Sequence, residues 1–242
     1  MSMATGLKRR MSARLPDGLK AALKQVRFEL AAGRVARAAQ PAFAALRGRG
    51  GLKLHLGAGD DIRLGWVNTD LRLRTPPEID PARHPDTVFI NHDLRRGLPL
   101  DENSCELIYS SHFFEHLTFE EGLALMREAH RVLAPGGVFR MALPDFPSIF
   151  AAYTAGDKGY FEAVPLPALF PDAPAGTLTL VDQVNYGVYQ YGEHKAVYDE
   201  EKACALLKAA GFSRVGSTLY REGLDPPNDL RRRYSFYVEA VK

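Results

Sequence analysis

The chain has 242 residues, of which 46% are hydrophobic and 25% charged, a balance typical of one soluble globular domain with additions. Its two cysteines, Cys105 and Cys204, stand far apart, which excludes a disulfide framework and favours a cytoplasmic protein. No apolar run approaches the roughly 20 residues of a membrane-spanning helix, and the start of the chain lacks the apolar core of a secretory signal.

The first fifty residues are far more basic than the rest. They hold eleven Lys or Arg against only Asp17 and Glu29, whereas the remaining residues hold twenty basic and twenty-seven acidic ones. Apolar residues recur there near helical spacing, which predicts a basic amphipathic helix: Leu19, Leu23, Val26, Leu30 and Val35.

We expect the apolar stripe of this helix to pack on the domain or on a second copy of the chain in a homodimer. The alternative is a cationic helix that settles on anionic lipid, as a peripheral membrane contact, or on nucleic acid or another acidic polymer. A third interpretation of this segment is an organelle transit peptide, because such peptides are typically rich in Arg and poor in acidic residues.

From residue 51 onward, short apolar runs alternate with helical segments, which indicates parallel β-α units with ligands at the carboxyl ends of the strands. A helix is predicted over Phe119–Val132 and is stopped by Ala134-Pro-Gly-Gly137. The predicted strands are Leu52–Leu56, Trp66–Thr69, Thr87–Asn91, Glu106–Ser110 and Val138–Leu143.

The end of the chain predicts a helix over Asp199–Ala210, followed by two antiparallel strands over Ser213–Tyr220 and Tyr234–Val241. Between the fifth strand and this helix, residues 145–198 match no regular unit and hold ten of the chain's twenty-four aromatic residues. Such an insertion above the carboxyl edge of a sheet suits a substrate lid. The simpler interpretation is a satellite hydrophobic cluster that covers the sheet.

The first strand ends in a glycine-rich turn at Gly57 and Gly59, where bare backbone can approach a ligand closely. Acidic residues follow the next two strands: Asp70 can accept the hydroxyl groups of a ribose, and Asp93 the exocyclic amine of a purine. Each acid alone is more often a helix or turn cap, but the three elements occur in the order that a nucleoside site requires.

These segments resemble the successive cofactor motifs of class I S-adenosylmethionine-dependent methyltransferases, in particular the type 11-like subgroup. The resemblance implies a Rossmann-like seven-stranded α/β sheet of order 3-2-1-4-5-7-6 with the last strand antiparallel. It covers residues 52–145, and the last helix and hairpin, Tyr198–Lys242, also fit the sheet of that family. We therefore expect a methyltransferase domain over residues 51–242, with residues 1–50 as a basic helical extension outside it and residues 145–198 as an inserted lid. The motifs are Leu54-His-Leu-Gly-Ala-Gly-Asp60, Trp66-Val-Asn-Thr-Asp70, Asp93-Leu-Arg-Arg-Gly-Leu-Pro99, Glu106-Leu-Ile-Tyr-Ser-Ser-His-Phe-Phe-Glu-His-Leu117 and Arg131-Val-Leu-Ala-Pro-Gly-Gly-Val-Phe-Arg-Met-Ala-Leu-Pro-Asp145.

The resemblance also implies roles for individual residues. The residues expected to bind S-adenosylmethionine are Leu56, Gly57, Ala58, Gly59, Asp70, Leu71, Asp93, Leu94, Ser110 and Ser111. Those expected near the transferred methyl group and the acceptor are His112, Glu115, His116 and His194. Glu115 and His116 can equally be residues of a helix start, and His194 a polar loop residue.

Two departures from the family pattern stand out. His55 replaces an acid that, in many members, helps to hold the amino group of the cofactor, and the loop is Gly-Ala-Gly-Asp rather than the fuller glycine pattern. The same loop argues against a dinucleotide oxidoreductase, because Ile62 stands where that fingerprint has a third small residue.

We therefore expect a methyltransferase that uses S-adenosylmethionine and acts on a small-molecule or glycan acceptor at oxygen. No metal is expected, because the histidines form no cluster with an acid at a recognised ligand spacing. Nucleic acid is not the expected partner, but the basic start and Arg231–Arg233 leave open a nucleic-acid-directed methyltransferase. A catalytically inactive adaptor that binds S-adenosylmethionine is the other alternative.

Overall fold

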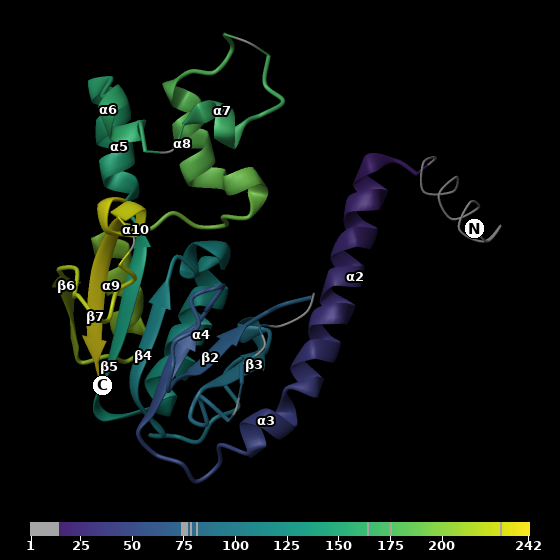
Figure 1. Cartoon of the computed structure of the whole chain (residues 1–242), viewed down its shortest axis with the longest axis vertical. Coiled ribbons are helices and arrows are strands. Elements are labelled where there is room, and N and C mark those ends of the chain that lie inside the picture. The colour runs from purple at the N-terminus through teal and green to yellow at the C-terminus, as the bar shows by residue number, and fades with distance from the viewer. Residues whose placement is uncertain are drawn as a thin grey trace.

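A seven-stranded sheet forms the centre of the computed structural model, which describes residues 15–242 except 74–76, 78, 81, 164, 175 and 228 (Figure 1). Its order is β3-β2-β1-β4-β5-β7-β6, and β7 runs antiparallel to both of its neighbours. The expected order and the antiparallel last strand are therefore confirmed. The strands are β1 (Leu52–Leu56), β2 (Val67–Asp70), β3 (Val88–Asn91), β4 (Cys105–Ser111), β5 (Leu133–Pro144), β6 (Arg214–Thr218) and β7 (Ser235–Val241).

The central strands carry the main hydrophobic core. Leu54, Ile108 and Phe139, one each from β1, β4 and β5, are fully buried. Burial on both faces explains why these strands read as almost continuous apolar runs in the sequence. Because β1, β2, β3 and β4 are parallel, their carboxyl ends meet at one edge of the sheet, and the site lies there.

The helix predicted over Phe119–Val132 is confirmed as α4, with the same bounds. Thr118 and Glu121 form a capping box, in which each side chain accepts a hydrogen bond from the other residue's backbone amide. The chain enters β5 directly at Leu133, five residues before the predicted Val138. Leu133 pairs with Cys105 across a register irregularity, so the Pro-Gly-Gly segment continues the strand instead of forming a separate turn.

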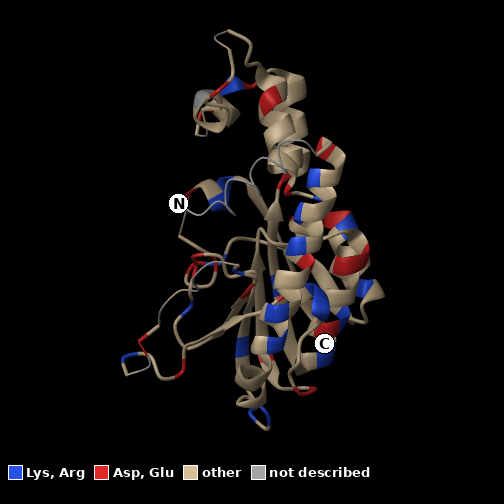
Figure 2. Cartoon of the chain, turned by 90° about the vertical axis from the view of Figure 1, so that its right-hand side faces the viewer, with Lys and Arg blue, Asp and Glu red and all other residues tan. Residues whose placement is uncertain are grey.

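The basic segment at the start forms α2 (Asp17–Ala38) and α3 (Gln40–Ala44). Phe43 and Leu46 belong to the main core, so this segment shares the core of the sheet, while the boundary expected at residue 50 stays a prediction. In Figure 2, Lys and Arg recur along the whole of α2. Of the described helices, none is long and apolar enough to cross a membrane.

The apolar stripe of α2 does not pack on the domain as expected. Ala32, Gly33 and Ala36 form the buried face, and a Cβ atom at Gly33 would lie 3.5 Å from the guanidinium of Arg96. By helical spacing the stripe lies about a quarter-turn around the helix from this face, and four of its five residues are exposed, with 39–59% of each accessible: Leu19, Leu23, Val26 and Leu30. Contact of this stripe with a second copy, a lipid surface or nucleic acid stays a prediction.

Residues 145–198 contain helices that the sequence analysis did not predict. These helices lie beyond the carboxyl ends of β4 and β5 (Figure 1). They are short, and Pro147 and Pro167 fall in their first turns, so no long apolar periodicity marks them. Phe146, Ile149 and Phe161 form a separate small core there. The helices are α5 (Phe146–Ala155), α6 (Lys158–Phe161), α7 (Leu166–Leu169), α8 (Leu180–Tyr189) and the 3-10 turn η3 (Gln190–Gly192).

The helix predicted over Asp199–Ala210 is confirmed as α9, whereas the short helix α10, between the last two strands, was not predicted. The helix α9 begins after Asp199, whose side chain accepts a hydrogen bond from the Lys202 amide as an N-cap. Short 3-10 turns follow β3 and β4 at the edge where the site lies. These elements are α9 (Glu200–Ala209), α10 (Asp229–Arg233), η1 (Leu94–Arg96) and η2 (Phe114–His116).

Candidate functional site

The turn after β1 brings bare backbone to the edge of the sheet. Gly57 has φ +66°, and a Cβ atom there would lie 2.3 Å from the ring of Phe113. Gly59 has φ +53°, but a Cβ there would meet nothing within 4 Å among the described residues. The turn therefore packs tightly on one side and is open on the other, which is the geometry a ligand against the main chain requires.

Asp70, at the end of β2, faces this turn. Its two carboxylate oxygens accept hydrogen bonds from the amides of Gly59, at 2.9 Å, and Leu71, at 2.7 Å. Each oxygen keeps a lone pair for a further donor. Arg72 fixes the same turn from outside, because its guanidinium donates to the Gly59 carbonyl and, at 2.8 Å, to Asp60.

A cavity of about 800 Å³ opens in front of Gly57, Gly59 and Asp70. Its outer wall is α2, which contributes Phe28 and Lys24. A smaller cavity of about 140 Å³ adjoins it and is also lined by Phe28. The basic extension, which lies outside the family resemblance, is thus part of the wall of the candidate cofactor site.

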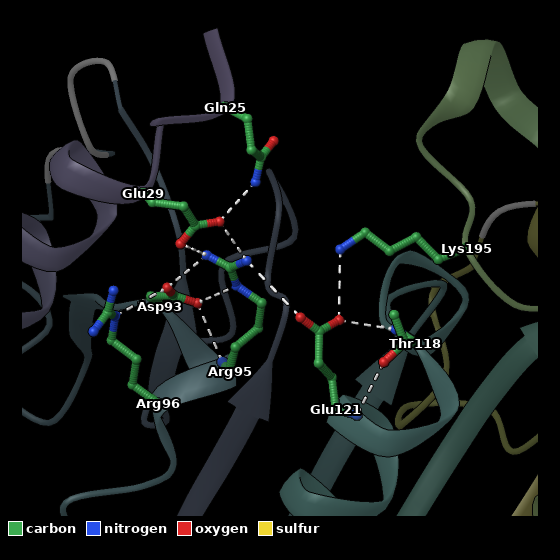
Figure 3. A network of polar contacts seen from close by, with 8 residues as sticks. All are labelled: Gln25, Glu29, Asp93, Arg95, Arg96, Thr118, Glu121 and Lys195. Atoms are coloured by element: carbon green, nitrogen blue, oxygen red, sulfur yellow. Dashed lines mark hydrogen bonds and ion pairs between the residues drawn. The ribbon is translucent and has the colours of Figure 1, made fainter. Parts of the chain in front are cut away.

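A network of charged residues joins α2 to this end of the sheet (Figure 3). At its centre, the Arg95 guanidinium donates to both oxygens of Glu29 at 2.9 and 3.0 Å and to both oxygens of Asp93 at 2.9 Å. Arg95 also lies 3.9 Å from Glu121, whose other oxygen lies 3.5 Å from the Lys195 ammonium. The network holds α2, η1 and the start of α4 in one arrangement.

The two acids that pair with Arg95 remain ionised. Hydrogen bonding to Arg95 lowers the pKa of Glu29. Burial of Asp93 acts to raise its pKa, but the hydrogen bonds and charge of Arg95 outweigh this, and its pKa is lowered. Both acids in turn raise the pKa of Arg95.

Asp93 lines the smaller cavity, but its acceptor positions are largely taken. Besides the bonds above, its two oxygens accept from the Arg95 amide and from Arg96, each at 3.2 Å. A carboxylate offers about four lone-pair positions, so we expect Asp93 to act on a bound adenine by holding Arg95 rather than by accepting its amine. The sequence analysis did not predict that the neighbouring Arg95 and Arg96 occupy the Asp93 carboxylate.

The structure places the ten expected cofactor-binding residues in three groups. Six line one of the two cavities: Gly57, Gly59, Asp70, Leu71, Asp93 and Leu94. Three are buried behind this wall: Leu56, Ala58 and Ser110. The hydroxyl oxygen of Ser111, the tenth, is buried without a hydrogen-bond partner in the described part of the chain.

The residues present fit S-adenosylmethionine. The open side of Gly59 leaves room for its methionine portion, and the free lone pairs of Asp70 can accept its ribose hydroxyls. The adenine can lie against Phe28 in the smaller cavity, where the Phe28 ring also contacts Arg95, whose guanidinium carbon is 5.3 Å from the ring centroid. His55, found where many family members have an acid, is buried below the turn, and burial lowers its pKa to about 4.

A second, mostly apolar cavity of about 160 Å³ lies under the inserted helices. Ile149 of α5, Tyr160 and Phe161 of α6 and Tyr186 of α8 form much of its wall. Burial raises the pKa of Tyr160, and its hydroxyl oxygen is buried without a partner in the described part of the chain. The aromatic insertion therefore encloses a cavity as well as forming its own small core.

His112 stands where the 800 Å³ cofactor cavity and the cavity under the inserted helices meet, because it lines both. It follows β4 with φ +48°, a strained conformation for a residue other than glycine. Its Nε2 atom lies 2.7 Å from the Ser235 Oγ, and its Nδ1 atom 3.7 Å from the Glu115 Oε1. Burial lowers the pKa of His112 well below its usual value, so its ring is neutral near pH 7.

Glu115, His116 and His194 lie next to His112. Glu115 is fully buried, and burial raises its pKa to about 8, although the charge of Arg231 opposes this. The His116 and His194 rings pack edge to face with centroids 4.8 Å apart. Burial lowers the pKa of both histidines. The structure thus brings the four expected catalytic residues together, but their chemical roles stay predictions.

Sequence reasoning missed several residues of these cavities, including Phe28, Arg95 and Lys195. For Phe28, its position on the face of α2 opposite the exposed stripe was an available signal, because that face had to contact something. For Arg95 and Lys195 the sequence held no such signal, since both act through partners far along the chain.

Comparison with known proteins supports the family resemblance. Residues 73–141 match a family model described as a methyltransferase domain. No curated protein matches the sequence.

Similar solved structures include a possible exported protein from Bordetella parapertussis (17% identity, TM-score 0.47, covering 87% of this chain and 67% of that one). The methyltransferase SibL matches at 15% identity and a TM-score of 0.46, and covers 84% of this chain and 52% of that one. A methyltransferase from Archaeoglobus fulgidus matches at 16% identity and a TM-score of 0.46, and covers 88% and 94%. With TM-scores below 0.5, the fold assignment rests on the strand order observed here.

The matched model, the strand order and a cavity suited to the cofactor agree with the motifs quoted above. The match over residues 73–141 therefore supports the resemblance of this chain to S-adenosylmethionine-dependent methyltransferases.

Proposed function

We propose that the protein methylates a hydroxyl oxygen of a small-molecule or glycan acceptor held in the cavity under the inserted helices. The observation that carries this proposal is the position of His112, which lines both the cofactor cavity and the inserted cavity. When bound, S-adenosylmethionine supplies a methyl group on a positively charged sulfur.

The apolar cavity supports an acceptor with a flat, weakly polar face. Tyr160, Phe161 and Tyr186 offer aromatic surfaces, which suit either a planar ring or the CH-rich face of a sugar. The tyrosine hydroxyl groups can fix the orientation of the acceptor. In Figure 2 the inserted helices carry few charged residues, which disfavours a highly charged acceptor.

Positioning supplies most of the catalysis in this proposal. Methyl transfer is an in-line displacement, so holding the acceptor oxygen about 3 Å from the methyl carbon and aligned with it lowers the barrier strongly. The new O–C bond forms as the S–C bond breaks, and the hydroxyl proton passes to the neutral imidazole of His112. Ser235 fixes the orientation of that imidazole through the 2.7 Å contact.

The test pairs cofactor binding with methyl transfer. We expect calorimetry to show binding of S-adenosylhomocysteine, and isotope-labelled S-adenosylmethionine to label a small or glycan product in cell extract. His112→Asn suits the positive φ, since Asn adopts this conformation more readily than most residues. It should keep the affinity within about threefold but lower the transfer at least roughly 100-fold, the usual loss for a general base.

The matched control is Ser235→Ala, which keeps the imidazole but removes its partner. We expect an intermediate loss of transfer. Absence of any heat on cofactor addition, or label found only in nucleic acid, would overturn the proposal.

A further inference from the structure

Three side chains beside His112 offer metal-ligand atoms to one point. One ligand atom from each of Glu115, His116 and His194 lies within 4.8 Å of the other two. Glu115 and His116 belong to η2, whereas His194 follows η3 at the end of the inserted lid. His194 lies 78 positions after His116, which explains why ligand spacing in the sequence did not predict this cluster.

Glu115 is the least satisfied member of the cluster. It has no accessible surface, and neither carboxylate oxygen has a hydrogen-bond partner within the described residues. Leaving a buried polar group unpaired is costly, and most such groups in folded proteins have a partner or bind an ion. A cation at this point would supply the missing interaction for both oxygens.

His194 is already oriented as a ligand. Its Nδ1 atom lies 2.8 Å from the carbonyl oxygen of Gly187. A carbonyl can only accept, so Nδ1 carries the proton and Nε2 presents a lone pair. That Nε2 atom is buried and has no partner among the residues described. Metal-binding histidines commonly donate their second nitrogen to a backbone carbonyl in this way.

His116 completes the set from the cofactor side, since it lines both cofactor cavities. Ligands at a tetrahedral zinc ion with bonds of about 2.1 Å lie roughly 3.4 Å apart. The separations of up to 4.8 Å here therefore need only small side-chain rotations to close around one ion.

We propose that Glu115, His116 and His194 bind one divalent first-row transition-metal ion. Two imidazoles and one carboxylate suit zinc, manganese or iron(II), whereas magnesium and calcium prefer oxygen ligands alone. Three protein ligands leave coordination positions open, as in catalytic metal sites. Because the cluster lies between the cofactor cavity and the lid cavity, the open position faces the acceptor. The ion then holds the acceptor oxygen there, a role that rests on the proposed function; binding of the ion itself does not.

Cobalt(II) is the probe that tests this site, because its visible absorption reports the ligands and their number. The full chain, stripped of metal by a chelator, should bind one cobalt(II) per chain with intense visible bands, and zinc should displace it. Glu115→Gln and His194→Asn should each weaken the affinity at least roughly 100-fold, since loss of an outer partner alone costs 10–100-fold. His84→Gln, which changes a histidine outside the cluster, is the matched control and should bind normally.

The wild-type titration decides the proposal even where a variant fails to fold, which circular dichroism would reveal. No cobalt(II) bands in the wild type, or equal binding by folded cluster variants, would overturn it. Cobalt(II) binding without labelled product would count against the proposed function alone. Labelled product from a protein that binds no cobalt(II) or zinc would count against the metal site alone.

Discussion

The cofactor cavity and the lid cavity meet at His112, but they are lined by different kinds of side chain. The cofactor side is a charged framework in which Arg95 ties α2 to η1 and approaches α4 through Glu121. The lid side is lined by aromatic residues on short helices with their own small core. A polar framework fixes the position of a ligand that carries many hydrogen-bonding groups. An aromatic enclosure, in contrast, selects shape and excludes water.

The tight turn at Gly57 gives the largest expected effect on the cofactor side. Gly57→Ala forces a side chain into φ +66° and into the Phe113 ring. We expect the free energy of unfolding to fall by about 2–4 kcal/mol, from backbone strain and overpacking together. Chemical denaturation measures this. Gly65→Ala is the control: it also has positive φ but open space, so its loss should be about 1–2 kcal/mol.

Phe28 tests whether α2 is part of the cofactor site. Phe28→Ala should weaken S-adenosylhomocysteine binding by about 10-fold, because stacking of a base on an aromatic ring contributes about 1–3 kcal/mol. Calorimetry measures the change. Leu23→Ala alters the exposed stripe of the same helix and should leave the affinity unchanged. If the Phe28 variant and the wild type bind with equal affinity, Phe28 does not contribute to the cofactor site.

His55, which is buried below the glycine turn, should make the free energy of unfolding depend on pH. Its pKa is about 4 in the folded chain and 6.5 in the unfolded one, so the unfolded chain binds more protons between these values. Stability should therefore fall as the pH drops from 6.5 to 4, by at most about 1.4 kcal/mol per pH unit from this residue. Denaturation at several pH values should show a shallower slope for His55→Gln than for the wild type. An unchanged slope would argue against this cause.

A substitution in the inserted lid should have the smallest effect on cofactor affinity. Ile149→Ala enlarges the aromatic cavity and should change S-adenosylhomocysteine affinity by less than about twofold, while labelled transfer to the acceptor falls. A parallel loss of affinity would show that the two cavities act as one.

The two sides also differ in how far the sequence predicts them. On the cofactor side, strand ends, glycines and acids follow one another locally, so Gly57, Gly59 and Asp70 were found together. The bounds of α4 could be predicted because its N-terminal cap and the spacing of its apolar residues both depend only on residues that are close in the sequence. Contacts between distant segments were not predicted: Glu29 with Arg95, or His194 with His116. The helices of the inserted lid were not predicted, because they are short and because prolines fall in their first turns.

The wall that α2 provides changes what a minimal form of this enzyme would be. A shortened protein that begins at residue 51, where the recognised motifs start, would keep every strand and the glycine turn. It would lack Phe28 and Glu29, and Arg95 would lose the helix-borne carboxylate that holds its guanidinium. Such a protein would bind the nucleoside more weakly than the intact chain does, although its fold and its recognised motifs would be complete.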